Sequence, residues 1–238
     1  MRRVTLLTAC LTLAAMIAVV AQTKPSIGSV EFTDAAGDVG PIHTMTTGPS
    51  GSTEKDFPGF DVIKLSIVTD GKQITVTATL KSPPADVASS AVELYFDLDN
   101  SKKTGAALDY TPFGGFEFRG SLDACLTLSD SVNSCAGAHA TAAAKLVRRY
   151  AIVSLDRFKG LKETAGREQL VDSAGFFGTM KAPQTPIVGA VVQASLAYDA
   201  LKVTSGRTIR IVVRESSAHP TPTGTPQGFF PEVLLTLK

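Results

Sequence analysis

Residues 63–80 read IKLSIVTDGKQITVTATL, and this stretch decides the fold class. Apolar residues alternate with polar ones on both sides of Asp70-Gly71, and Asp-Gly between alternating runs is the strongest short signal for a β-hairpin. The threonines of the second run suit a half-exposed pleated surface. The sequence therefore predicts two antiparallel strands joined by a tight turn.

The same period of two recurs along the chain. It predicts further strands at residues 92–97, 116–119, 192–196, 209–214 and 233–237. Many short strands separated by turn residues indicate a sandwich or a barrel. We therefore expect an all-β fold, an antiparallel β-sandwich with one short helix.

Four segments depart from this alternation. Ser154 to Lys162 has the composition of a short helix with Ser154 as its N-cap, and Tyr198 to Leu201 predicts a single helical turn. Residues 41–57 and 216–228 are rich in Gly, Pro, Ser and Thr. We expect these two segments to form long loops, which in compact domains are usually functional or mobile.

The first 21 residues predict a secretory signal peptide. Two arginines precede an apolar run from Val4 to Val20, and the small-residue pattern ending at Ala21 marks a cleavage site. The alternative is a retained membrane anchor, but no basic stop-transfer cluster follows the run. Lipidation at Cys10 is a minor alternative, because the apolar stretch before it is short. We expect an extracytoplasmic protein, periplasmic or secreted, with residues 22–238 as one domain and no membrane span.

Removal of the signal peptide changes the charge balance. The formal net charge of +1 includes Arg2 and Arg3, so their loss leaves −1. A near-neutral chain has no electrostatic footprint for DNA, RNA or anionic lipid. The charge therefore predicts no nucleic-acid partner.

Two cysteines remain after residue 21. Cys125 and Cys135 form an even pair, which in an oxidising compartment predicts a disulfide. A metal site at these cysteines would need further ligands, and only His139 lies near them in the sequence. The bridge closes a short loop and is expected to add about 2–3 kcal/mol of stability.

The richest polar motif is Phe96-Asp97-Leu98-Asp99-Asn100, followed by Thr104-Gly105 and Asp109. Carboxylates one residue apart at the end of a strand can converge where a turn begins, and Ca²⁺ takes six to eight oxygen ligands. Asp97, Asp99, the Asn100 side chain and a loop carbonyl could supply several of them. The motif is no EF-hand, since Lys102 and Leu108 replace the Gly and Glu of that loop. The alternative is a polar turn whose side chains cap their own backbone.

A second acidic turn contains Asp34 and Asp38, with Asp61 further along the chain. It too is either a cation loop or only a turn. The three histidines are isolated, and no HExxH, P-loop or Gly-x-Ser-x-Gly motif is present. We therefore expect a protein without enzymatic activity.

Several of these motifs occur together in known families. The run from Leu94 to Asn100, Thr104-Gly105 and Gly115 to Phe118 resembles family 9 carbohydrate-binding modules and DOMON-like sandwiches. Residues 192–201 and 205–211 resemble their late strands. Residues 34–38 and 57–62 are similar to the C-terminal domain of glucodextranase-type enzymes. Together the resemblances cover most of the chain after residue 21, in order.

The resemblance implies a jelly-roll-like sandwich, a structural Ca²⁺ site and a non-catalytic role near polysaccharide or the cell envelope. Asp97 and Asp99 would form the cation site, with Asp109 or Glu117 as helpers. Asp34, Asp38 and Asp61 would form a separate one.

The sequence departs from the family in its aromatic residues. Family 9 modules hold sugars between Trp rings, and this chain has no Trp. Stacking would fall to weaker platforms, whose alternative role is core or turn packing: Tyr95, Tyr110, Tyr150 and Phe113.

Three functional hypotheses follow. The first is a secreted, calcium-stabilised module that binds carbohydrate or envelope glycan. The second is an envelope protein–protein interaction domain without sugar binding. The third is a haem binder of the DOMON type, with His43 and Met45 as the candidate axial ligands.

Overall fold

The computed structural model describes most of the chain between residues 25 and 238. The described residues are 25–34, 36–37, 39, 42–48, 51–57, 60–107, 114–129, 133–135, 140, 144–158, 170–173, 184–215 and 230–238. The predicted signal peptide therefore lies outside them, as does the expected loop at residues 216–228. Within the described part, no helix has the length and apolar character needed to cross a membrane.

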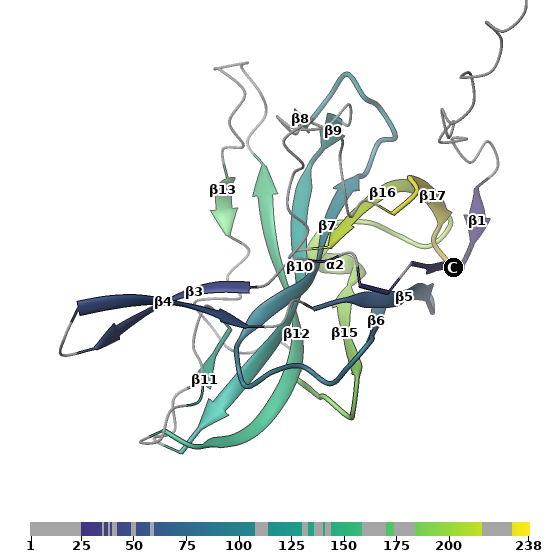
Figure 1. Ribbon diagram of the computed structural model, residues 1–238. Coiled ribbons are helices and arrows are strands. Elements are labelled where there is room, and N and C mark those ends of the chain that lie inside the picture. Colours follow the sequence, from purple (N-terminus) through teal and green to yellow (C-terminus); the bar gives the residue numbers. More distant parts are fainter. Residues whose placement is uncertain are drawn as a thin grey trace, which may run out of the picture.

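Two curled sheets form a sandwich-like arrangement (Figure 1). The larger sheet has nine strands in the order β1-β17-β16-β7-β10-β12-β13, with β11 added on β10 and β14 on β12. All its pairs are antiparallel except β1 with β17. Its strands are β1 (Ser26–Ile27), β7 (Ser89–Asp97), β10 (Phe118–Leu128), β11 (Asn133–Ser134), β12 (Leu146–Phe158), β13 (Leu170–Ser173), β14 (Thr185–Pro186), β16 (Thr208–Glu215) and β17 (Val233–Thr236).

The second sheet has four strands in the order β15-β6-β5-β2. These are β2 (Ser29–Thr33), β5 (Val62–Thr69), β6 (Gln73–Leu80) and β15 (Val191–Ala197). The hairpin predicted from residues 63–80 is β5–β6, with Thr69 opposite Ile74. The Asp70 carboxylate accepts the N–H groups of Lys72 and Gln73 at 3.0 Å and so closes the turn.

The apolar positions of both sheets meet in one main core. Alternate residues of β5, β6 and β15 point inward, and those of β7, β10, β12, β16 and β17 meet them. Among the largest buried side chains of this core are Leu65, Ile67, Ile74, Leu94, Phe96 and Leu122. The all-β sandwich expected from the alternation is confirmed.

The outer face of the larger sheet carries the opposite set of residues. Arg210, Tyr95, Asp97 and Asp123 alternate with the core positions and are themselves almost fully buried. A small apolar cluster on this face joins Tyr95 to Phe116, near the pair β8 (Ala106–Ala107) and β9 (Gly114–Phe116). This end of the outer face holds the acidic residues of the candidate site.

Two expectations were wrong. Residues 42–48 and 51–57, expected within a long loop, are the strands β3 (Ile42–Gly48) and β4 (Gly51–Phe57), paired in register from Ile42 with Phe57 to Gly48 with Gly51. Figure 1 shows this hairpin projecting from the side of the sandwich. Their threonine-rich composition is that of a strand surface as much as of a loop.

In the described part of the segment expected to be helical, residues 154–158, there is no helix, because β12 continues to Phe158; residues 159–162 lie outside the described residues. Ala151, Val153 and Leu155 alternate into the core, and pairing with β10 overrides the local helical signal. The helical turn expected at residues 198–201 is confirmed as α2 (Tyr198–Leu201), which ends where Lys202 adopts a left-handed φ of 56°. It is the one short helix of the described residues.

Candidate cation site

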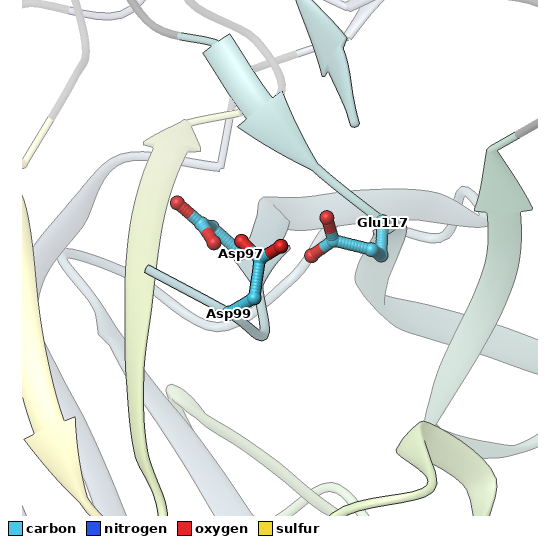
Figure 2. A group of neighbouring side chains, drawn as sticks. All are labelled: Asp97, Asp99 and Glu117. Carbon is cyan, nitrogen blue, oxygen red and sulfur yellow. The ribbon is translucent and has the colours of Figure 1, made fainter. Parts of the chain in front are cut away.

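Three carboxylates converge where β7 ends. Asp97 is the last residue of β7, Asp99 lies in the following turn, and Glu117 lies at the bend between β9 and β10 (Figure 2). One oxygen from each carboxylate lies within 4.8 Å of the others. The pairing of β7 with β10 brings Glu117 close to Asp97 and Asp99. Phe118 is paired with Phe96, and Glu117 donates its N–H to the Phe96 carbonyl at 2.9 Å.

Asp97 is fully buried against an arginine. Its Oδ2 lies 2.6 Å from Nη2 and 2.8 Å from Nε of Arg210, which is also buried. Its Oδ1 accepts the N–H of Ser101 at 3.1 Å. Burial raises the pKa of the Asp97 carboxyl, and the hydrogen bond and charge of Arg210 act in the opposite direction.

The side chain of Asp99 stabilises the turn after β7 by hydrogen bonds within that turn. Its Oδ1 accepts the N–H of Ser101 at 3.0 Å, and the Thr104 hydroxyl donates to Oδ1 and Oδ2 at 3.0 and 2.8 Å. Asn100 is exposed and has a left-handed φ of 55°, which reverses the chain between Asp99 and Ser101. The polar-turn interpretation therefore describes the hydrogen bonds of Asp99.

Glu117 is the third member. Its Oε2 accepts the N–H of Leu98 at 2.6 Å. Burial raises the pKa of the Glu117 carboxyl, and the negative charges of Asp97 and Asp99 raise it further. The backbone between Asp97 and Asp99 is thus tied directly to Glu117, which the sequence implied only as a helper.

Arg210 connects this site to the C-terminal part of the chain. Its Nη1 lies 3.0 Å from Oε2 of Glu232, its Nη2 donates to the Gly114 carbonyl, and its guanidinium carbon lies 5.0 Å from the centre of the Phe116 ring. Lys102 Nζ reaches the same Glu232 oxygen at 3.4 Å. Arg210 was not among the site residues expected from the sequence, because an arginine at an alternating strand position does not reveal which residue it pairs with.

The charges within this group do not cancel. Arg210 neutralises Asp97, whereas Asp99 and Glu117 accept hydrogen bonds from backbone N–H groups and a hydroxyl. Two oxygens bound to one Ca²⁺ at about 2.4 Å lie at most about 4.8 Å apart, and the three carboxylate oxygens here lie within 4.8 Å of one another. An all-oxygen set with two uncompensated charges therefore fits a hard divalent cation.

The second acidic turn forms no such group among the described residues. Asp34 is half-buried and its N–H donates to the Ile63 carbonyl at 3.1 Å. Asp61 accepts the N–H of Gly37 at 2.7 Å and lies 3.6 Å from Lys81 Nζ. Asp38 and Asp109, the other two predicted ligands, lie outside the described residues.

The aromatic candidates for sugar stacking are buried where the structure describes them. Tyr95 is fully buried, donates to Glu93 Oε2 at 2.8 Å and packs 5.5 Å from the Phe116 ring centre. Tyr150 is 1 % exposed and packs with Cys125. Core packing, the alternative role, is therefore confirmed for both.

Four other candidate residues, two for sugar stacking and two for haem ligation, cannot be assigned to a site. Tyr110 and Phe113 lie outside the described residues. The same holds for the side chains of His43 and Met45, whose backbone forms β3.

The predicted disulfide is present. Cys125 of β10 is bonded to Cys135, which directly follows β11, with ten residues of sequence separation. The bond ties β11 to the main sheet. No protein-family model, curated protein or solved structure matches this chain.

Proposed function

We propose that this protein is a secreted, non-catalytic β-sandwich module whose turn after β7 binds Ca²⁺, and which binds carbohydrate or cell-envelope glycan. The observation that carries the proposal is the convergence of Asp97, Asp99 and Glu117, with one oxygen from each within 4.8 Å of the others. The disulfide supports an oxidising, extracytoplasmic location.

The role proposed for the cation is structural. It joins the end of β7 to the start of β10 and neutralises the charges of Asp99 and Glu117. Asp97 needs it least, because Arg210 already supplies a positive charge. The protein groups supply three carboxylate oxygens, and backbone carbonyls and water complete the coordination that Ca²⁺ prefers.

Among the described residues, glycan binding in this proposal depends on hydrogen bonds. Tyr95, Tyr150 and Tyr198 are all buried and offer no stacking surface. The same observation favours a second candidate function, an envelope protein–protein interaction domain without sugar binding.

Thermal unfolding in EDTA and in millimolar Ca²⁺ tests the cation. For an extracellular site with a Kd on the order of 10⁻⁴ M, a hundredfold excess adds about 2.7 kcal/mol. For a domain of this size we expect the midpoint to rise by about 5–10 °C. The rise should vanish in Asp99→Asn with Glu117→Gln and persist in the matched control Asp199→Asn, whose exposed carboxylate lies outside the cluster. No rise in the unsubstituted protein, together with metal analysis that finds no bound ion, would refute the site.

A panel of immobilised polysaccharides, screened in Ca²⁺ and in EDTA, tests the ligand. Retention on at least one polymer is expected for the module. A Ca²⁺-stabilised protein that binds none, but recovers one stoichiometric partner from an envelope extract, would instead establish the interaction domain.

A further inference from the structure

The outer face of the four-stranded sheet is rich in hydroxyl and amide side chains. Alternate residues of β2, β5, β6 and β15 pack into the core, and the residues between them face outward. We call this surface the polar face. It consists of every second residue of four runs: Ser29 to Thr33, Lys64 to Val68, Gln73 to Thr79 and Val191 to Ala197.

The strand register aligns these side chains in rows across the sheet. Gln193 of β15 is paired with Thr77 of β6, and Thr77 is paired with Ser66 of β5. Ser66 is in turn paired with Glu31 of β2. Neighbouring strands lie about 4.8 Å apart, so this row presents four hydrogen-bonding side chains over about 14 Å. Gln193 and Glu31, at the two ends of the row, are exposed.

The polar face has almost no net charge. Its two charged residues are Glu31 and Lys64, whose Oε2 and Nζ atoms lie 2.9 Å apart. A soluble surface carries about 25–35 % charged residues. The face also has no Trp, Tyr, Phe, Met or Arg, the side chains that are enriched in protein interfaces. A neutral ligand rich in hydroxyl groups therefore complements this face better than a protein or a polyanion does.

The side chains of the face are held in place before a ligand binds. Thr75 and Thr77 are β-branched, which restricts their χ1 angles, and the Thr75 hydroxyl lies 2.8 Å from the Ser195 hydroxyl across the strands. Side chains that are already ordered lose little entropy on binding. Val68 and Val191, which are 43 and 38 % exposed, add apolar surface for the C–H face of a sugar ring.

We propose that the polar face binds an extended, uncharged polysaccharide. The spacing between strands is close to the length of one pyranose unit, so a chain that lies across the strands meets a polar side chain at each sugar. The inference rests on the proposed glycan function and assigns it to the four-stranded sheet, whereas the turn after β7 belongs to the larger sheet.

Affinity electrophoresis in gels that contain a single polysaccharide tests the face. We expect retention by at least one neutral polymer among β-glucan, xylan and mannan, and free migration through alginate and polygalacturonate. Retention should persist in EDTA at a temperature at which the protein stays folded, because the polar face contains none of the three carboxylates of the cation turn.

Substitutions assign the binding to the face. Thr77→Val and Gln193→Ala should each lower the affinity about fivefold, and the double variant should lower it about 25-fold. Valine keeps the β-branched shape of threonine, so β6 should persist. Thr204→Val is the matched control, because this exposed threonine lies outside the four strands, and it should bind as the unsubstituted protein does.

The outcomes separate the inference from the proposed function. Retention that the double variant keeps in full would overturn the inference and leave glycan binding intact. Migration without retention in every gel would overturn both. Retention by the acidic polymers alone would also overturn the assignment, because the face is neutral. An envelope protein that the double variant fails to recover, with glycan binding unchanged, would assign the face to a protein partner instead.

A second measurement does not depend on the variants. Backbone amide signals of β5, β6 and β15 should shift when an oligosaccharide of the retaining polymer is added to the unsubstituted protein. Shifts confined to the larger sheet would overturn the inference. Circular dichroism of each variant separates lost binding from lost folding.

Discussion

Arg210 and Asp97 lie 113 residues apart in the sequence, and both are almost completely buried, with 2.6 Å between Nη2 and Oδ2. The pair joins β16 to β7 at the base of the carboxylate cluster. Removal of one partner from a buried ion pair leaves an uncompensated charge, whereas removal of both leaves none. The pair therefore links the stability of the fold to the geometry of the candidate site.

Arg210→Met should lower the free energy of unfolding by about 3–5 kcal/mol, because it leaves Asp97 buried without its cation. Asp97→Asn should cost less, since Arg210 keeps Glu232 as a partner. The double variant should recover part of the loss. Urea unfolding of the unsubstituted protein, the two single variants and the double variant gives the coupling energy between Arg210 and Asp97. Strictly additive effects of the two substitutions would contradict the predicted coupling.

Asp123→Asn should stabilise the protein at neutral and alkaline pH. Burial raises the pKa of the Asp123 carboxyl above its ordinary value of 3.8, against hydrogen bonds from Ser90 and Ser154 at 2.6 and 2.7 Å. The folded protein therefore holds this proton more tightly than the unfolded chain, so its stabilising effect is lost as pH rises through the folded-state pKa. Asparagine stays neutral throughout.

The measurement is the unfolding midpoint of both proteins from about pH 4 to about pH 8. The variant should exceed the unsubstituted protein at the upper end, and the two should converge at the lower end. A difference that is independent of pH would show that Asp123 does not titrate in this way.

Gly115→Ala should displace the turn that carries Asp99. Gly115 has a φ of 89°, and a Cβ there would lie 2.3 Å from the Ser101 carbonyl oxygen and 2.9 Å from the Lys102 Cα. The variant should lose the stabilisation by Ca²⁺. Gly206→Ala is the matched control, because its φ of 82° has a similar intrinsic cost, about 1–2 kcal/mol, and the space around it is open. If both variants lowered Ca²⁺ binding equally, the predicted clash between the new Cβ at position 115 and the turn at Ser101 and Lys102 would be contradicted.

Reduction of the Cys125–Cys135 disulfide should lower stability by about 2–3 kcal/mol, since the closed loop is short. The midpoint should fall by about 5–10 °C for a domain of this size. Dithiothreitol should have no effect on the variant in which both cysteines are serine. An unchanged midpoint after complete reduction, verified by thiol titration, would contradict the prediction.

Local patterns predicted local structure well. The β5–β6 hairpin followed from Asp70-Gly71, because its strands are neighbours in sequence and its turn chemistry is distinctive. The helix predicted from Ser154 was wrong because serine is a common N-cap residue. In the structure its hydroxyl instead donates to Asp123 and contacts the Ser121 hydroxyl at 2.5 Å. That contact arises only once β12 has paired with β10.

The candidate site was predictable in part for the same reason. Asp97 and Asp99 belong to one turn, so the sequence alone places them together. Arg210 reaches them only through the pairing of β16 with β7, opposite Asp97 itself. The burial of Tyr95 and Tyr150 likewise depends on tertiary packing, which an alternating pattern does not specify.

The position of β7 between β10 and β16 has a consequence for how the protein folds. One neighbour follows it closely in the sequence, whereas the other is formed by residues 208–215. Closing so long a loop costs entropy before any contact repays it, and pairings of this kind slow folding. We expect the larger sheet to remain incomplete until β16 has been synthesised and has paired with β7.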